Sequence, residues 1–140
     1  MKLIVSLLLL LSTRLLVFSQ STDSVASPSN KYKIVTGKAT FYSACLDGTK
    51  TSTGEIFNNK NMTAASNSFK MHTWVMVKNL SNNKTVVVRI NDRMHPRMAK
   101  KGRIIDLSGA AAKKLGFLKK GVTRVEVEQV DKPVRKLAKS

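Results

Sequence analysis

The chain has 140 residues, a formal net charge of +17 and one cysteine, Cys45. This length suits one small domain and is too short for two. A single cysteine excludes an internal disulfide, and with it the disulfide-rich modules common among secreted proteins. We expect Cys45 to be buried and inert, because no Cys–His pairing that would make it a nucleophile is suggested by the sequence.

The N-terminal segment predicts export. Residues 1–19 combine a positive start at Lys2, an apolar run and a small residue, Ser19, at the end, which is typical of a secretory signal peptide. Arg14 interrupts the apolar run, which falls short of the ~20 residues that a bilayer needs, so we expect no transmembrane span. No cysteine stands at the expected cleavage site, so no lipid anchor is predicted. The protein should therefore work in a periplasm or outside the cell.

Composition divides the remaining chain into three parts. Residues 20–33 are a Ser-rich flexible leader, residues 34–130 carry the pattern of one folded domain, and residues 131–140 form a basic tail. The basic excess indicates an anionic partner. Export argues against nucleic acid, as do one Trp and two Tyr, too few for a base-stacking surface. Anionic cell-wall glycans fit better, and a solvated basic surface without a specific partner is the alternative.

The first half of the domain has the pattern of strands. Residues 34–42 predict a strand, and Gly37 inside it indicates a bulge or the close approach of another segment. Residues 73–80 and 84–91 both alternate between apolar and polar side chains. The Asn-rich connection between them predicts a tight hairpin, because Asn tolerates positive φ.

The second half predicts a strand, a helix and a strand. Residues 103–107 form a short strand, and Ser108 stands where the N-cap of a helix over 110–115 is expected. Gly116 ends that helix, and residues 122–130 form the closing strand. The sum predicts an all-β domain with one or two short helices, arranged as a small barrel.

The run from Val86 to Arg93 is the most informative stretch. An apolar strand ends there in Asp92, which lies between Arg89 and Arg93 in sequence. A strand end holds an acid rigidly at a surface cleft, which suggests catalysis. The alternative is that Asp92 simply pairs with Arg89 or Arg93, because structural ion pairs are common.

Glu55 is the second carboxylate of interest, because it follows a turn of small and hydroxyl residues around Gly54. A loop Glu facing a strand-end Asp suits glycan cleavage, in which one group protonates the leaving oxygen and another stabilises charge or deprotonates a nucleophile. Asp106 is an alternative carboxylate for this role, but we expect it to pair with Arg89 or Arg103. The remaining alternatives are Asp47, Glu126 and Glu128, the last two expected to be solvated on one face of a strand.

Seven short motifs, taken in order, resemble the rare lipoprotein A family: residues 37–42, 48–55, 63–65, 77–80, 88–93, 102–108 and 110–112. The resemblance covers residues 37–127. It implies a six-stranded double-psi β-barrel that binds peptidoglycan glycan strands. It also implies a lytic transglycosylase that acts on peptide-stripped strands, cleaving the MurNAc–GlcNAc bond and leaving a 1,6-anhydro end. We expect no metal, no other cofactor and a monomeric protein.

The resemblance places the catalytic roles on Asp92 and Glu55. Asp92 would protonate the glycosidic oxygen and then take the proton of the MurNAc 6-hydroxyl, which attacks its own anomeric carbon. Glu55 would orient the sugar or stabilise oxocarbenium character. Burial would raise the pKa of Asp92 and the flanking arginines would lower it, so the sequence leaves the direction open. The predicted substrate-binding residues are Thr51, Gly54, Ser66, Arg89, Asn91, Arg93, His95 and Asp106.

The chain departs from the family pattern at two places. The family has a functional His directly after the Thr-Ala-Ala segment, where this chain has Ser66. We do not expect His72 to replace that imidazole. The family continues with Gly-Pro-Phe after the Asp-Arg pair, and here His95 could restore a polar group beside the acid. The missing His keeps open a non-catalytic glycan-binding barrel similar to expansins, and, as a third class, a structural or partner-binding envelope protein.

Overall fold

The computed structural model describes residues 32–134, so the expected signal peptide, most of the leader and the end of the tail lie outside the described residues. The described part contains six strands, two short α-helices and one 3-10 turn. In chain order these are β1 (Ile34–Phe41), η1 (Ala44–Leu46), β2 (Thr63–Ala65), β3 (Trp74–Asn79), β4 (Thr85–Asp92), α1 (Pro96–Lys100), β5 (Arg103–Leu107), α2 (Gly109–Leu115) and β6 (Thr123–Val130).

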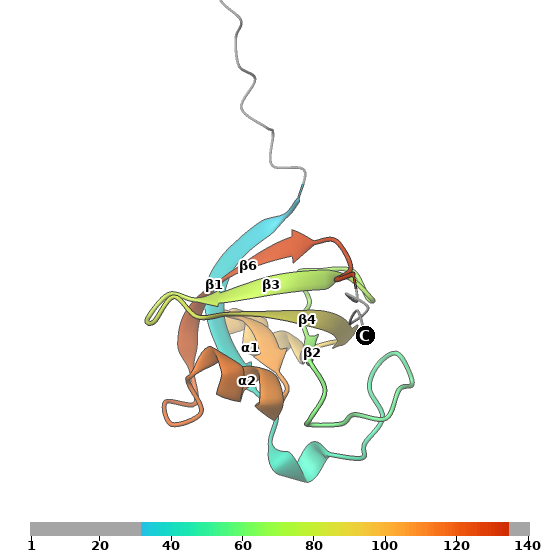
Figure 1. Ribbon diagram of the computed structural model, residues 1–140. Coiled ribbons are helices and arrows are strands. Elements are labelled where there is room, and N and C mark those ends of the chain that lie inside the picture. Colours follow the sequence, from blue (N-terminus) through green and yellow to red (C-terminus); the bar gives the residue numbers. More distant parts are fainter. Residues whose placement is uncertain (1–31, 135–140) are drawn as a thin grey trace, which may run out of the picture.

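The six strands close into a barrel in the order β1-β5-β2-β4-β3-β6 (Figure 1). β1 is parallel to β5 and β2 is parallel to β4, whereas the other neighbours are antiparallel. The segment between β1 and β2, cyan to green in Figure 1, loops out beyond the strands before it returns. The predicted all-β barrel with two short helices is confirmed, and the long loop carries the turn that contains Glu55.

Side-chain alternation builds the core. On β4, Val86, Val88 and Ile90 are buried while the residues between them are partly exposed. α2 adds its own apolar face to the same core, because Ala111, Ala112 and Leu115 are fully buried against the strands. The remaining buried members of the core cluster are Ala39, Ala64, Phe69, Val75, Val77, Ile105, Leu107, Phe117, Val125 and Val127.

Local signals in the sequence identify the turns and caps correctly. The Ser108 hydroxyl accepts a hydrogen bond from the Ala111 N–H at 3.3 Å, and Gly116 ends α2 with a φ of 77°. Asn83 turns the β3–β4 hairpin at a φ of 61°. A Cβ on Gly37 would lie 2.6 Å from Cγ2 of Ile104, so the predicted close approach is confirmed. Neither α-helix of the described part is long enough to cross a bilayer.

Several predictions need correction. Cys45 is exposed in η1, not buried, because the loop that carries it lies outside the core. Glu126 and Glu128 are half-buried rather than solvated. β2 and α1 were not predicted as elements: β2 has three residues, all buried, so it shows no alternation, and α1 has only five residues.

Candidate active site

Asp92 lies at the last position of β4 and accepts four hydrogen bonds. The Tyr42 hydroxyl donates to Oδ2 at 2.7 Å, and the backbone N–H groups of Ser52 and Arg93 each donate to Oδ1 at 2.8 Å. The Ser52 hydroxyl also donates to Oδ1. These donors lie directly after β1, in the long loop and directly after β4, so the tertiary fold brings them together around this carboxylate.

The simple ion-pair interpretation of Asp92 is wrong. The Arg89 guanidinium binds Glu55, and the Arg93 guanidinium donates to the backbone carbonyls of Ser66 and Phe69, the latter at 2.6 Å. Within residues 32–134, the salt bridges join other carboxylates to arginines and leave Asp92 out. Its negative charge is therefore stabilised by hydrogen-bond donors rather than by a paired cation.

The two opposing influences on the pKa of Asp92 have a clear outcome. Partial burial raises this pKa, but the hydrogen bonds from Ser52, Tyr42 and the Arg93 N–H outweigh burial and hold it below its usual value. Asp92 is therefore a carboxylate at neutral pH. Burial, and then the hydrogen bond to Asp92, raise the pKa of the Tyr42 hydroxyl, which stays protonated as a donor.

Glu55 is held by a bidentate pair with Arg89. Nη1 donates to Oε1 at 2.9 Å and Nη2 to Oε2 at 2.7 Å, and Nδ2 of Asn91 adds a contact to Oε2 at 3.2 Å. The hydrogen bonds from Arg89 and then Asn91 lower the pKa of Glu55 to about 2. Glu55 is therefore a fixed anion at neutral pH, which suits charge stabilisation or positioning better than proton transfer.

The turn before Glu55 brings it to the end of β4. The Thr51 N–H donates to the Glu55 carbonyl at 2.8 Å, and the Gly54 N–H donates to the Thr51 carbonyl at 2.9 Å. Gly54 has a φ of +84°, a conformation that favours glycine. Ser52 in this turn contacts Asp92, while Glu55 contacts the two residues of β4 on either side of Ile90. One turn thus links both predicted catalytic carboxylates to a single strand end.

Asp106 on β5 lies in a different environment from Asp92. It is buried, the Thr40 hydroxyl donates to its Oδ1 at 2.7 Å, and Nη2 of Arg103 lies 3.6 Å from the same oxygen. The predicted pairing with Arg103 is confirmed, and the alternative with Arg89 is not found. Burial raises the pKa of Asp106 despite these two contacts, so this carboxyl binds a proton more tightly than Asp92 does.

Asp92 and Asp106 flank the short strand β2. Ala65 pairs with Asp92 on one side and with Asp106 on the other, so the two residues lie at the same level of the barrel. Two strand spacings place their Cα atoms about 10 Å apart. The register shift between Ala64 and Ala65 leaves Asn91 as an extra residue in β4, and bulges of this kind commonly re-aim side chains near functional sites.

Three further predicted binding residues have structural contacts in the described part of the chain. Ser66 is fully buried, and its hydroxyl donates to the Ile104 carbonyl at 2.7 Å. Asn91 is 3% exposed and turned toward Glu55. Arg93 is exposed as a residue, although its guanidinium is anchored on backbone carbonyls. Of the three, Ser66 lies least accessible to a ligand.

The two histidines lie in different places. His72 has a φ of 64°, and its Nδ1 is 3.2 Å from Nη1 of Arg89, next to the Glu55 pair. His95 precedes α1, where its Nδ1 accepts the Arg97 N–H at 3.2 Å. Within residues 32–134, the hydrogen bonds of the two imidazoles go to Arg89 and Arg97 and not to Asp92.

Sequence reasoning missed the donors around the two aspartates. Tyr42 and Ser52 belong to the motif segments 37–42 and 48–55, but nothing in one sequence says that they contact Asp92 across separations of 50 and 40 residues. Thr40 was likewise missed beside Asp106. Among residues 32–134, no group of three His, Cys, Asp or Glu side chains could hold a metal ion.

Comparison with known sequences relates the chain to cell-wall enzymes. A sequence model described as lytic transglycolase matches residues 34–127. The endolytic peptidoglycan transglycosylase RlpA of Haemophilus influenzae is 43% identical over 112 residues, covering 80% of this chain and 38% of the relative. RlpA of Pseudomonas aeruginosa is 44% identical over 100 residues, covering 71% and 28%. The chain therefore spans about a third of the length of these curated relatives.

Solved structures share the fold at lower identity. The Streptomyces papain inhibitor superposes with a TM-score of 0.56 at 23% identity, covering 71% of this chain and 96% of that protein. A mutant Clavibacter michiganensis expansin in complex with cellohexaose gives a TM-score of 0.56 at 21% identity, covering 74% and 54%. At such identities the likeness concerns the fold alone.

Proposed function

We infer that this chain, which belongs to the lytic transglycolase family and its RlpA-like double-psi β-barrels, cleaves peptidoglycan glycan strands as a lytic transglycosylase. The observation that carries this proposal is the pair of aspartates flanking β2 in opposite environments. Such a substrate belongs to the bacterial cell envelope, so the protein would act in the periplasm or outside the cell. This agrees with the predicted export signal.

We further propose that the two aspartates divide the proton transfers. Asp106 holds a proton more tightly and would donate it to the GlcNAc O4 as the bond to MurNAc C1 breaks. Asp92 is ionised and would take the proton of the MurNAc 6-hydroxyl as the O6–C1 bond forms. Passing that proton from Asp92 to Asp106 restores both groups, and no water is consumed. This proposal differs from the expectation that Asp92 performs both steps, and the experiment below distinguishes the two.

Glu55 has a supporting role in this mechanism. Its pKa of about 2 and its bidentate pair with Arg89 keep it anionic throughout the reaction. A fixed negative charge beside the anomeric carbon would stabilise oxocarbenium character, and a fixed carboxylate can also orient sugar hydroxyls. The predicted binding residues Arg89 and Asn91 would act through Glu55, because their side-chain nitrogens already contact it.

The test is cleavage of amidase-stripped glycan strands by the purified protein, followed by mass spectrometry. We expect fragments with 1,6-anhydro ends. Asp92→Asn and Asp106→Asn should each lower the rate by at least about a hundredfold, the usual contribution of a general acid or base. If Asp106→Asn retains the full rate while Asp92→Asn does not, one residue performs both steps and the division proposed here is wrong.

Glycan binding without cleavage is the second candidate. Ser66 favours it, because the family's imidazole is absent and the serine hydroxyl is buried in a bond to Ile104. In that case the wild-type protein would bind stripped strands, no anhydro-ended fragments would form, and the two Asp→Asn variants would differ from the wild type only in affinity. The same incubation, with a parallel pull-down of the strands, separates the two functions.

A further inference from the structure

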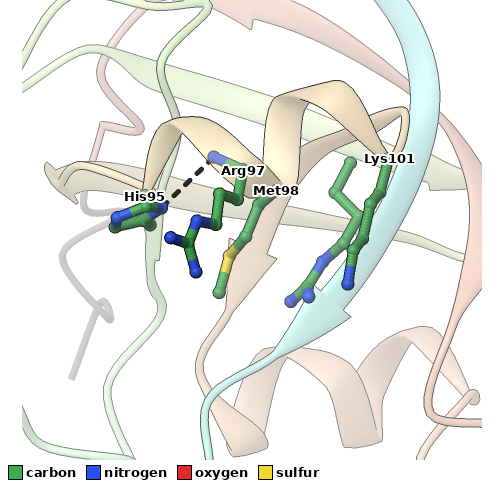
Figure 2. Close-up of a pocket in the computed structure, with 5 residues that line it drawn as sticks. His95, Arg97, Met98 and Lys101 are labelled. Atoms are coloured by element: carbon green, nitrogen blue, oxygen red, sulfur yellow. Dashed lines mark hydrogen bonds between the residues drawn. The ribbon is translucent and has the colours of Figure 1, made fainter.

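A cationic cavity adjoins the candidate active site. Its volume is about 290 Å³, and it is lined by His95, Arg97, Met98, Lys101 and Arg103. Figure 2 shows Arg97, Met98 and Lys101 projecting to the same side of α1. Three guanidinium or ammonium groups therefore share one small space, and the described residues that line it include no carboxylate. Such an arrangement favours an anionic ligand.

Arg103 connects this cavity to the buried acid. Its Nη2 donates to the Thr40 hydroxyl and lies 3.6 Å from Oδ1 of Asp106. The Thr40 hydroxyl in turn donates to the same Asp106 oxygen at 2.7 Å. A ligand charge in the cavity would thus lie one side chain away from the proposed proton donor, close enough for both to contact neighbouring parts of one substrate.

The size and lining of the cavity restrict the ligand further. Its volume lies at the lower end of the ~300–1,000 Å³ common for small-molecule sites, which suits a single sugar ring or its acidic substituent. Met98 provides an apolar surface, while the planar guanidinium groups of Arg97 and Arg103 match the geometry of a carboxylate. MurNAc carries a lactyl group whose carboxylate is free only where the peptide has been removed.

We propose that the cavity between α1 and β5 binds the lactyl carboxylate of a MurNAc residue and thereby distinguishes peptide-stripped strands from peptide-bearing ones. This inference rests on the proposed function, because it assigns a substrate group to the same site. A peptide-bearing strand presents an amide in place of the carboxylate, so the cationic lining would lose its charged partner.

Binding of monosaccharides tests the inference without requiring cleavage. The purified protein, labelled with ¹⁵N, is titrated with MurNAc and, separately, with GlcNAc, which lacks the lactyl group. We expect MurNAc alone to shift the amide signals of residues 97–103. The double variant Arg97→Ala/Lys101→Ala, which changes two exposed side chains, should weaken MurNAc binding about tenfold.

The matched control is Lys119→Ala/Lys120→Ala, which removes the same charge beside the end of α2 and should leave MurNAc binding unchanged. Equal binding of MurNAc and GlcNAc, or an equal effect of the two double variants, would overturn the inference. If strands are cleaved but MurNAc shows no preference, the cavity assignment fails and the proposed function stands. If MurNAc binds at residues 97–103 but no strand is cleaved, the proposed catalysis fails instead.

Discussion

Asp92 and Asp106 show how surroundings give one residue type two different acidities. Asp92 is surrounded by hydroxyl and backbone donors that favour its ionised form, whereas Asp106 is buried with the Thr40 hydroxyl and a more distant arginine. The two pKa values move in opposite directions for that reason. Such a separation is the usual basis for assigning an acid and a base within one site.

Among the donors to Asp92, the Tyr42 hydroxyl can be removed with the smallest change to the rest of the site. Tyr42→Phe deletes the 2.7 Å hydrogen bond but keeps the ring that packs on Phe57. Losing a donor to the ionised form raises the pKa of Asp92. The acid limb of the pH–rate profile for strand cleavage should then move to higher pH, and NMR titration of the Asp92 carboxyl should move with it.

Tyr32→Phe is the control for that substitution, because the Tyr32 hydroxyl contacts Asp131, outside the site. It should leave both the pH–rate profile and the Asp92 titration as in the wild type. An Asp92 titration that is identical in Tyr42→Phe and the wild type would contradict the proposed origin of its low pKa.

Glu55 contributes a stability that depends on pH. Its pKa is about 2 in the folded protein against 4.5 for the ordinary side chain, so folding favours the ionised form. The contribution is present above about pH 4.5 and is lost as the pH falls toward 2. The melting temperature of Glu55→Gln should therefore lie below that of the wild type at pH 6, and the gap should shrink between pH 4.5 and 2. A gap that stays constant over this range would show that Glu55 acts on stability by packing alone.

At the scale of elements, α2 is part of the core rather than a surface addition. Leu115 is fully buried among the strands, while its neighbour Lys114 is exposed. Leu115→Ala should lower the free energy of unfolding by about 2–5 kcal/mol, because it leaves a cavity that the barrel cannot close completely. Urea denaturation measures the change. Lys114→Ala should change it by no more than about 0.5 kcal/mol, and equal losses in the two variants would contradict this role of α2.

The elements that could be predicted were those with a repeating pattern or a strong terminal signal. The β3–β4 hairpin has alternation and an Asn-rich turn, and α2 has a serine N-cap and a glycine C-cap. β2 has neither, since three buried residues carry no period. β2 nevertheless lies between Asp92 and Asp106. The strand that sets the spacing of the two aspartates was therefore the one that the sequence pattern did not predict.

At the scale of the whole molecule, the large excess of basic over acidic residues bears on association with anionic glycan. Because salt screens exposed charges, raising NaCl from about 0.05 to about 0.3 M should weaken binding to peptide-stripped strands. Over the same range of NaCl, binding to strands whose lactyl carboxyls have been amidated should weaken much less. Cosedimentation with both kinds of strand at both salt concentrations measures this, and an equal salt dependence would rule out recognition of the lactyl charges.

The sequence by itself determined the strand-rich fold class, most element boundaries to within a residue or two, and the position of Asp92 at the end of β4. Periodicity, caps and motif order are local properties, and local properties can be read along one chain. Only the tertiary structure decided the partners: Arg89 with Glu55 rather than with Asp92, and Tyr42 and Ser52 around Asp92. It also decided that the pKa of Asp92 moves down while that of Asp106 moves up. Those outcomes depend on segments that meet only when the barrel closes, because pKa values are determined by burial and by donors distant in sequence.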